Sequence, residues 1–438
     1  MGPTETCSMT NTKLARIAWL SARDPGKRFD HLMHHFTKES LAACFHALDG
    51  NKAVGLDGVS KAHYGEHLRE NLEDLVGRLK RMAYRPMPVR QVLVPKDGQP
   101  GATRPLGISV LEDKIVQKEM QRVLESIYEP LFLDCSYGFR PGRGCHDAIK
   151  ALHQHLWRNE VETVIDLDLA NFFGTISHEF LEEMLREKIG DQRVLRYLRR
   201  MFKAGVLADG DLVMSDSGVP QGSICSPVLA NVFAHHVIDI WFETTVKAHC
   251  RGRVELFRYA DDAVICCRYT QDAVRIKEAL RQRLARYQLQ LNEGKTRLVP
   301  FSKRAQRQGD QQEGFDFLGF TFYLGKSRKH TVIPKLKTSG KRMRTKLRRL
   351  QDWARRVANI LPLTQLWRVF CSKMQGHIRY YAVTFNTHAV DAFLGRATRL
   401  LFRRLNRRSQ RKSFTWEKFR RFIALHPLPR VSVCHALY

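Results

Sequence analysis

Apolar residues recur along much of the chain at steps of three and four, the spacing of one helix face. The segment 64–82 shows the pattern well, because Leu68, Leu72, Leu75 and Leu79 fall in one stripe. The same spacing predicts helices over 34–48, 112–128, 177–189, 192–203 and 271–287, and a long helix that opens at 218–223 and runs to 248. Helices therefore dominate the first two thirds of the chain.

Strands are predicted where apolar and polar residues alternate. The segment 161–169 alternates in this way, and two β-prone runs, 254–259 and 263–267, flank Asp261 and Asp262. Three more segments are short: a hairpin of 91–94 with 104–108, a small hairpin over 206–214, and one aromatic strand over 315–322 after a polar linker, 302–313. The mixture predicts an α/β fold.

From Lys335 onward the composition changes to helices with basic faces. This last part holds 25 Lys and Arg against three acids, whereas the whole chain has 438 residues and a net charge of +29. The cations that line the predicted outer faces are Arg342, Lys346, Arg349, Arg356, Arg396, Arg399, Arg403 and Arg407. Because such an excess repels itself unless a polyanion neutralises it, a nucleic acid is the expected partner.

Two neighbouring carboxylates, Asp261 and Asp262, are expected at the tip of a hairpin between buried strands. They repel each other, and a divalent cation such as Mg²⁺ compensates where substrate phosphates supply further ligands. A second carboxylate closes the strand 161–169, where Asp166 and Asp168 alternate onto the same face. The pattern alone leaves open which of those two binds a metal ion.

Other segments offer groups suited to phosphates. Arg90, Lys96 and Arg104 lie on or beside the 91–108 hairpin and form a candidate triphosphate clamp, and Arg140 and Arg143 occupy a Gly/Arg-rich loop. The ten cysteines include no C-x-x-C pair, so a zinc cassette is not expected. The cysteines are instead expected to be reduced thiols in a bacterial cytosol. No apolar run reaches membrane-spanning length, so no membrane partner is expected.

Six sequence blocks occur in a fixed order from about His34 to the end of the chain. They are Pro95-Lys96 with Arg104-Pro105-Leu106-Gly107-Ile108, Ser136-Tyr137-Gly138-Phe139-Arg140-Pro141, Asp168-Leu169 with Phe172-Phe173, Pro220-Gln221-Gly222 with Ser226-Pro227-Val228-Leu229-Ala230-Asn231, Tyr259-Ala260-Asp261-Asp262, and Phe317-Leu318-Gly319-Phe320. In this order the blocks resemble a group II intron reverse transcriptase, or maturase.

The resemblance implies roles for individual residues. Asp168, Asp261, Asp262 and the backbone carbonyl of Leu169 would bind two Mg²⁺ ions, for which Mn²⁺ can substitute, and Asp168 is thereby preferred to Asp166. Deoxynucleoside triphosphates would contact Arg90, Lys96, Arg104 and Gln221, while Phe173 would crowd a ribose 2′-hydroxyl. Lys295 would support the site, and the basic C-terminal helices would grip nucleic acid.

The resemblance also implies the architecture and the partners. The expected fold is a right-hand polymerase with an N-terminal extension (1–33), fingers with part of the palm (34–160), a palm (161–334) and an all-α thumb or maturase domain (335–438). The expected partners are a group II intron RNA, an RNA template with a DNA or RNA primer, and target DNA, with the oligomeric state open. The family's cysteine- and histidine-containing endonuclease tail is not expected.

Two other functions remain open. One is the same chemistry in a retron, a diversity-generating element, a CRISPR-linked system or phage defence. The other is a non-catalytic RNA-binding maturase that assists splicing, although the presence of Asp168, Asp261 and Asp262 weighs against it.

Overall fold

The computed structural model describes residues 3–95, 101–208, 211–214, 216–219, 222–407 and 415–438, and the side chains from residue 12 onward. Its N-terminal part is helical, with α1 (Pro3–Arg23), a 3₁₀ turn η1 (Leu32–His35), α2 (Lys38–Ala47), α3 (Lys61–Glu66), α4 (Leu68–Lys80) and α5 (Leu111–Tyr128). Both α1 and α2 pack on α5, and Leu14 and Ile17 of α1 are buried in the same core.

Two of the predicted N-terminal helices are shorter than expected. The 34–48 helix begins only at Lys38, because the Thr37 side chain caps it. The 64–82 helix is divided at His67, whose φ of −121° and ψ of 37° are not helical, so α3 and α4 are separate. The apolar stripe predicted for this segment is nevertheless buried, as Leu72, Leu75 and Leu79 show.

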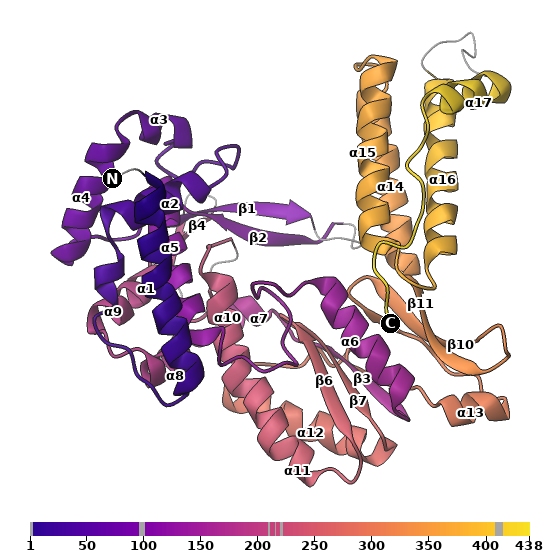
Figure 1. Cartoon of the computed structure of the whole chain (residues 1–438), viewed down its shortest axis with the longest axis horizontal. Helices are drawn as coiled ribbons and strands as arrows, with labels where there is room; N and C mark the ends of the chain where they lie inside the picture. The colour runs from indigo at the N-terminus through magenta and orange to yellow at the C-terminus, as the bar shows by residue number, and fades with distance from the viewer. Residues whose placement is uncertain (1–2, 96–100, 209–210, 215, 220–221, 408–414) are drawn as a thin grey trace.

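A small sheet has the order β2-β1-β4-β5, and its first two strands lie between α4 and α5 in the chain. Its strands are β1 (Val89–Pro95), β2 (Thr103–Ile108), β4 (Val206–Ala208) and β5 (Asp211–Val213). The hairpin β1–β2 has the predicted antiparallel pairing, with Val94 opposite Arg104. In Figure 1 this hairpin reaches from the N-terminal helices across the molecule toward the C-terminal helices.

The central sheet has the order β6-β7-β3-β8 and is antiparallel throughout. It consists of β6 (Val254–Tyr259), β7 (Asp262–Cys267), β3 (Thr163–Asp168) and β8 (Arg297–Pro300). One face, with Ile165 and Ile265, belongs to the core shared with the N-terminal helices. The other face, with Val164 and Val264, belongs to a second core that continues into the C-terminal helices. Alternation along each strand therefore joins two cores through one sheet.

Helices cover both faces of this sheet (Figure 1). Helix α6 (Cys145–Arg158) contacts β6, and α12 (Thr270–Arg286) contacts β3 and β7. The other helices of this part of the chain are α7 (Phe172–Thr175), α8 (His178–Lys188), α9 (Gln192–Phe202), α10 (Ser226–Ala234) and α11 (Lys247–His249). The helix predicted over 218–248 begins only at Ser226. It widens into two π-helical stretches, η2 (His235–Asp239) and η3 (Phe242–Val246).

A third sheet of order β11-β10-β9 connects the central sheet to the C-terminal helices. The aromatic segment predicted as one strand is two, β9 (Phe315–Phe317) and β10 (Phe320–Lys326), which pair with β11 (Val332–Thr338). A turn separates them because Leu318 and Gly319 adopt left-handed φ angles of 49° and 84°. The predicted linker before them contains a short helix, α13 (Lys303–Gln308).

The C-terminal part is a helical bundle of α14 (Gly340–Val357), α15 (Leu363–Tyr381), α16 (Thr387–Leu405) and α17 (Trp416–Leu425). Helix α16 contacts both α14 and α15. Leu350 and Ala354 of α14 and Phe393 and Ala397 of α16 are buried. In the described part of the chain, no helix is both long and apolar enough to cross a membrane.

Candidate active site

The two adjacent aspartates lie at the turn between β6 and β7, as the flanking apolar runs predict. Ala260 makes the turn with a left-handed φ of 58°, Asp261 follows it, and Asp262 is the first residue of β7. In the antiparallel register Asp262 stands directly opposite Asp168, the last residue of β3. Carboxylates separated by 94 positions in the sequence therefore meet as a cross-strand pair.

Asp166 shares this face of the sheet but has a different environment. It pairs with Arg297 of β8 at 3.2 Å, and it is more buried than Asp168. Asp168 pairs with Lys295 at 3.2 Å and lies where the strand ends. Its backbone is also held, because its carbonyl accepts a hydrogen bond from the Asn292 N–H at 2.8 Å. Asp168 is thus the accessible carboxylate of the two.

The carboxylates oppose one another's ionisation. Burial, together with the charges of Asp166 and Asp261, raises the pKa of Asp262 to about 7, although the backbone N–H of Leu318 donates to its carboxylate and acts in the opposite direction. Loss of surrounding solvent and the charge of Asp168 raise the pKa of Asp261, against the cation of Arg258. Such a concentration of negative charge is what a divalent cation neutralises.

Three of these carboxylates, those of Asp166, Asp168 and Asp262, line a cleft of about 650 Å³ between three parts of the molecule, and Asp261 is not among the described residues that line it. The central sheet contributes Asp166, Asp168 and Asp262, the hairpin contributes Arg104, and the C-terminal bundle contributes Lys341, Arg342 and Thr345 of α14. The turn Phe317–Gly319 completes the lining. Anionic and cationic walls therefore face one space, which suits a phosphorylated substrate accompanied by a metal ion.

The donor atoms fit Mg²⁺, because hard carboxylate oxygens are its preferred protein ligands. The side chains do not yet form one ligand set. Among the residues that the structure describes, no three His, Cys, Asp or Glu side chains are gathered closely enough to hold a metal ion. The backbone register brings Asp168 and Asp262 together, while the Asp168 carboxylate is paired with Lys295.

The predicted nucleotide contacts fall into separate places. Arg104 lines the cleft, whereas Arg90, four residues farther along the hairpin, donates to the Val54 carbonyl at 2.8 Å. Phe173 is half-buried, and its ring meets the exposed ring of Phe139 edge to face at 6.3 Å between centroids. Lys96 and Gln221 lie outside the described residues.

Comparisons with known proteins bear directly on this geometry. Residues 94–322, which contain the hairpin, the three aspartates and the Phe317–Gly319 turn, match the family described as reverse transcriptase (RNA-dependent DNA polymerase). The chain belongs to the reverse transcriptase family.

Individual relatives show which members of the reverse transcriptase family the chain is similar to. The chain is similar to Protein YkfC of Escherichia coli strain K12, with 31% identity over 347 residues, covering 72% of this chain and 88% of that protein. It is 31% identical over 235 residues to the group II intron-encoded protein LtrA of Lactococcus lactis, covering 53% of this chain and 39% of LtrA.

An uncharacterized 91 kDa protein in the cob intron of Schizosaccharomyces pombe is 37% identical over 188 residues, covering 43% of this chain and 22% of that protein. The chain thus spans less than half of the length of LtrA and of the yeast protein. These matches confirm the predicted resemblance to group II intron reverse transcriptases and maturases.

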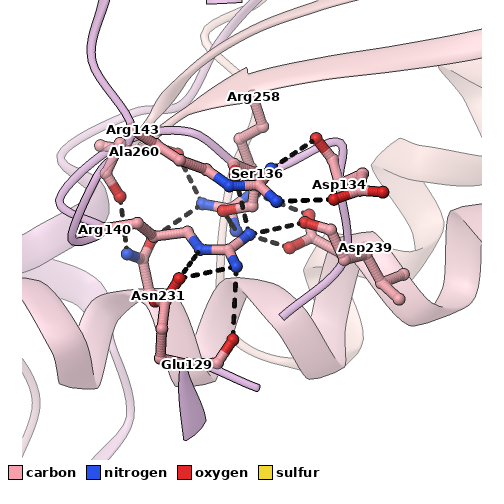
Figure 2. A network of polar contacts seen from close by, with 11 residues as sticks. Glu129, Asp134, Ser136, Arg140, Arg143, Asn231, Asp239, Arg258 and Ala260 are labelled. Carbon is pink, nitrogen blue, oxygen red and sulfur yellow. Dashed lines mark hydrogen bonds and ion pairs between the residues drawn. The ribbon is translucent and has the colours of Figure 1, made fainter. Parts of the chain in front are cut away.

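In this reverse transcriptase, Arg140 is a structural cation, which corrects its prediction as an RNA contact. Its side chain is only 4% exposed and pairs with Glu129 at 2.8 Å, while its Nη1 donates to the carbonyls of Leu133 and Ser136 (Figure 2). Arg143, by contrast, is 28% exposed and pairs with Asp134, which is almost entirely in solvent. Spacing in the sequence could not separate these two arginines.

The predicted cations of the C-terminal helices also differ in exposure and position. Arg349 and Arg356 of α14 and the predicted cations of α16 are exposed, while Arg342 lines the cleft. On α16 these are Arg396, Arg399 and Arg403, and Arg407, two residues beyond the end of the helix, is exposed as well. Lys346 is not on an outer face. Its Nζ lies 4.4 Å from the ring centroid of Tyr381, and burial beside Arg342 lowers its pKa to about 8.

A buried polar group that the sequence patterns did not predict lies behind the carboxylates. Arg258, inside β6, is fully buried and pairs with Asp239, which is buried as well. Tyr380 of α15 was overlooked too, although its hydroxyl donates to the Leu318 carbonyl at 2.9 Å in the turn beside Asp262. A charged residue at a buried strand position was the available signal for Arg258, since such a charge requires a partner.

Proposed function

We propose that this member of the reverse transcriptase family is catalytically active as an RNA-directed DNA polymerase. We further propose that it binds a group II intron RNA and assists its splicing. The observation that carries the proposal is the cross-strand pairing of Asp168 with Asp262 at the floor of a cleft that cations line on two other sides. The family membership supports the same chemistry.

Asp168, Asp261, Asp262 and the Leu169 carbonyl would hold two Mg²⁺ ions, or Mn²⁺ in their place. Bound metal supplies activation of a primer 3′-hydroxyl and stabilisation of the pyrophosphate that leaves the α-phosphorus. Arg104 would bind the triphosphate of a deoxynucleotide at this centre. The resemblance to the family assigns further contacts with the nucleotide to Arg90, Lys96 and Gln221. Lys295 would pair with Asp168 until the substrate enters.

Selection against ribonucleotides would fall to Phe173. Its position in α7, five residues after Asp168, and its contact with the Phe139 ring support this role. A rigid ring that occupies the place of a 2′-hydroxyl discriminates by steric exclusion rather than by hydrogen bonding.

The C-terminal bundle would bind the template–primer duplex and the intron RNA as the thumb and maturase domain (335–438), beyond fingers (34–160) and palm (161–334). Support comes from the exposed arginines along α14 and α16 and from the excess of cations in this part of the chain. Phosphate contacts dominate such binding, so target DNA would use the same surface.

Asp261→Ala and Asp262→Ala test the proposal. Each variant should reduce cDNA synthesis on a primed RNA template more than about 10³-fold, because each removes a carboxylate that would hold the catalytic metal ions. RNA binding and assisted splicing should persist, since the bundle is untouched. Asp74→Asn, an exposed acid of α4, is the matched control and should keep full activity.

A readout without catalysis completes the experiment. Mg²⁺ should raise the melting temperature of the unaltered protein and not that of either alanine variant, because ligand that binds only the folded state stabilises it. Unchanged cDNA synthesis by both variants would refute the site. Splicing without synthesis even in the unaltered protein would instead favour a non-catalytic maturase.

A further inference from the structure

Arg258 carries a full positive charge into the core immediately behind the candidate active site. It lies in β6, two residues before the turn residue Ala260, and it is 1% exposed. A guanidinium has five N–H groups, and each must find an acceptor when it is buried. In this protein all five do, and the acceptors come from three separate segments.

Asp239 is the strongest of these partners. It takes one hydrogen bond from Nε at 2.7 Å and one from Nη2 at 2.5 Å, a bidentate arrangement. Asp239 ends the π-helical stretch η2 that continues α10. The ion pair therefore joins β6 to the helix that covers the sheet.

The remaining three hydrogen bonds converge on the turn and on the loop beside it (Figure 2). Nη1 donates to the Asn231 side chain and to the backbone carbonyl of Ala260, each at 3.2 Å. Nη2 donates to the Ser136 hydroxyl at 2.7 Å. The Asn231 amide in turn donates to the Gly138 carbonyl at 2.7 Å, so one side chain links the guanidinium to the loop.

The loop and the turn are in close backbone contact at this point. A Cβ on Gly138 would lie 2.4 Å from the backbone nitrogen of Ala260, so only glycine allows the approach. Ala260 itself has the left-handed φ of 58° and is buried. A non-glycine residue holds that conformation only where its surroundings determine it. Arg258 supplies the hydrogen bond that fixes the Ala260 peptide.

A role in stability alone does not account for this arrangement. A buried ion pair stabilises a fold little more than apolar residues of the same volume would, because desolvation opposes the attraction. The ion pair with Asp239 could make such a contribution to stability at any place in the core. Contacts to Ala260, Ser136 and Asn231 instead place the cation between the Asp261–Asp262 turn and its support.

We propose that Arg258 is a positioning residue for the polymerase reaction: it fixes the Ala260 peptide against the Ser136–Gly138 loop, and thereby sets where Asp261 and Asp262 stand relative to Asp168. The proposal rests on the proposed function for its kinetic readout. Amide hydrogen exchange at the turn provides a readout that does not depend on catalysis.

Arg258→Lys tests it. Lysine keeps the charge opposite Asp239, but a single ammonium cannot reach Ala260, Ser136 and Asn231 together. We expect kcat for cDNA synthesis to fall about 10- to 100-fold, because small displacements of reacting groups have effects of that size. KM for the deoxynucleotide and RNA affinity should stay within twofold, and amides of residues 260–262 should exchange at least tenfold faster.

Arg122→Lys is the matched control. Arg122 pairs with the buried Glu119 at 2.8 Å in α5, away from the turn, so the same substitution perturbs a comparable pair elsewhere. It should change neither kcat nor exchange at residues 260–262. Parallel losses in both lysine variants, following the loss of melting temperature, would show that Arg258 only stabilises the fold and would overturn the proposal.

Ser136→Ala covers the case in which Arg258→Lys does not fold. It removes one acceptor of the guanidinium and leaves the Asp239 pair intact. We expect a threefold or greater fall in kcat with faster exchange at the turn. Unchanged kcat and unchanged exchange would overturn the proposal. If the unaltered protein makes no cDNA, the proposed function fails, and the exchange data still decide the role of Arg258.

Discussion

Replacement of Arg140 by methionine should destabilise the protein without weakening its hold on RNA. Methionine retains most of the aliphatic stem and removes the guanidinium. The lost contacts are the Glu129 ion pair at 2.8 Å and the hydrogen bonds to the carbonyls of Leu133 and Ser136 at 2.8 and 3.0 Å. The Glu129 ion pair ties the loop before α6 to the end of α5, and the two carbonyl contacts hold the loop itself together.

The cost follows from burial. Breaking a buried ion pair costs about 3–5 kcal/mol, because the remaining partner is left uncompensated. Glu129 is 27% exposed and can regain some water, so the lower end applies, about 3 kcal/mol. With a urea m value of about 3 kcal/mol per molar, the unfolding midpoint of this part of the protein should fall by about 1 M.

Arg143→Met is the matched control from the same loop. Its partner Asp134 is 96% exposed, so the ion pair contributes about 0–1 kcal/mol and the midpoint should hardly move. Because this pair is exposed, the Arg143 guanidinium can exchange Asp134 for a phosphate, and its loss should lower the slope of log affinity against log salt by about one. Arg140→Met should leave that slope unchanged.

Urea denaturation followed by tryptophan fluorescence, with filter binding of RNA at several salt concentrations, measures both quantities. A structural role for Arg140 is refuted if Arg140→Met keeps its urea midpoint within 0.2 M of the unaltered protein and RNA binding loses salt dependence instead. That pattern would mean that the guanidinium leaves Glu129 and binds phosphate.

The other predictions concern the carboxylates, the nucleotide and the bundle. Asp262→Asn should make the metal-free protein more stable near neutral pH. The pKa of Asp262 is about 7 in the folded protein, above its ordinary value of 3.8, so the folded protein retains a proton that the unfolded chain releases. The stability of the unaltered protein therefore falls as the pH rises from about 4 to 7. Melting temperatures measured without divalent metal should show this fall in the unaltered protein and a smaller one in Asp262→Asn, and equal pH profiles would contradict the assignment. Phe173→Val should raise ribonucleotide incorporation relative to deoxynucleotide incorporation roughly 10- to 100-fold, measured as a ratio of kcat/KM values, and an unchanged ratio would remove Phe173 from the nucleotide site. Arg349→Gln and Arg356→Gln should each lower the salt slope of RNA binding by about one. The control is Arg281→Gln, which removes an exposed arginine of α12 and should leave the slope unchanged. Equal effects of all three substitutions would mean that net charge, rather than the C-terminal bundle, determines the slope.

Local patterns predicted the secondary structure well where a side-chain period was long and regular. The helix over 112–128 corresponds to α5, and the two apolar runs around Asp261 and Asp262 form β6 and β7. Patterns failed where one residue changed the backbone. The left-handed Leu318 divides a run of aromatics into two strands, and the capped start at Lys38 shortens a helix.

In the candidate site, too, local patterns predicted some features and could not predict others. Alternation placed Asp166 and Asp168 on one face, and the turn between apolar runs placed Asp261 beside Asp262. No pattern states that β3 lies beside β7 with Asp168 opposite Asp262, since strand order and register depend on contacts between distant segments. Likewise, no pattern distinguishes the buried Arg140 from the exposed Arg143, three residues later.

By itself the sequence determined the residue types of the site, the periodicity of each element and the excess of positive charge after Lys335, because these are properties of neighbours along the chain. Only the tertiary structure decided which carboxylates face each other, that Lys346 turns onto Tyr381, and that Arg258 is enclosed behind the turn with five acceptors. The physical reason is that burial and pairing are set by packing between segments distant in sequence. The same arginine is a surface charge or a structural cation according to what packs around it.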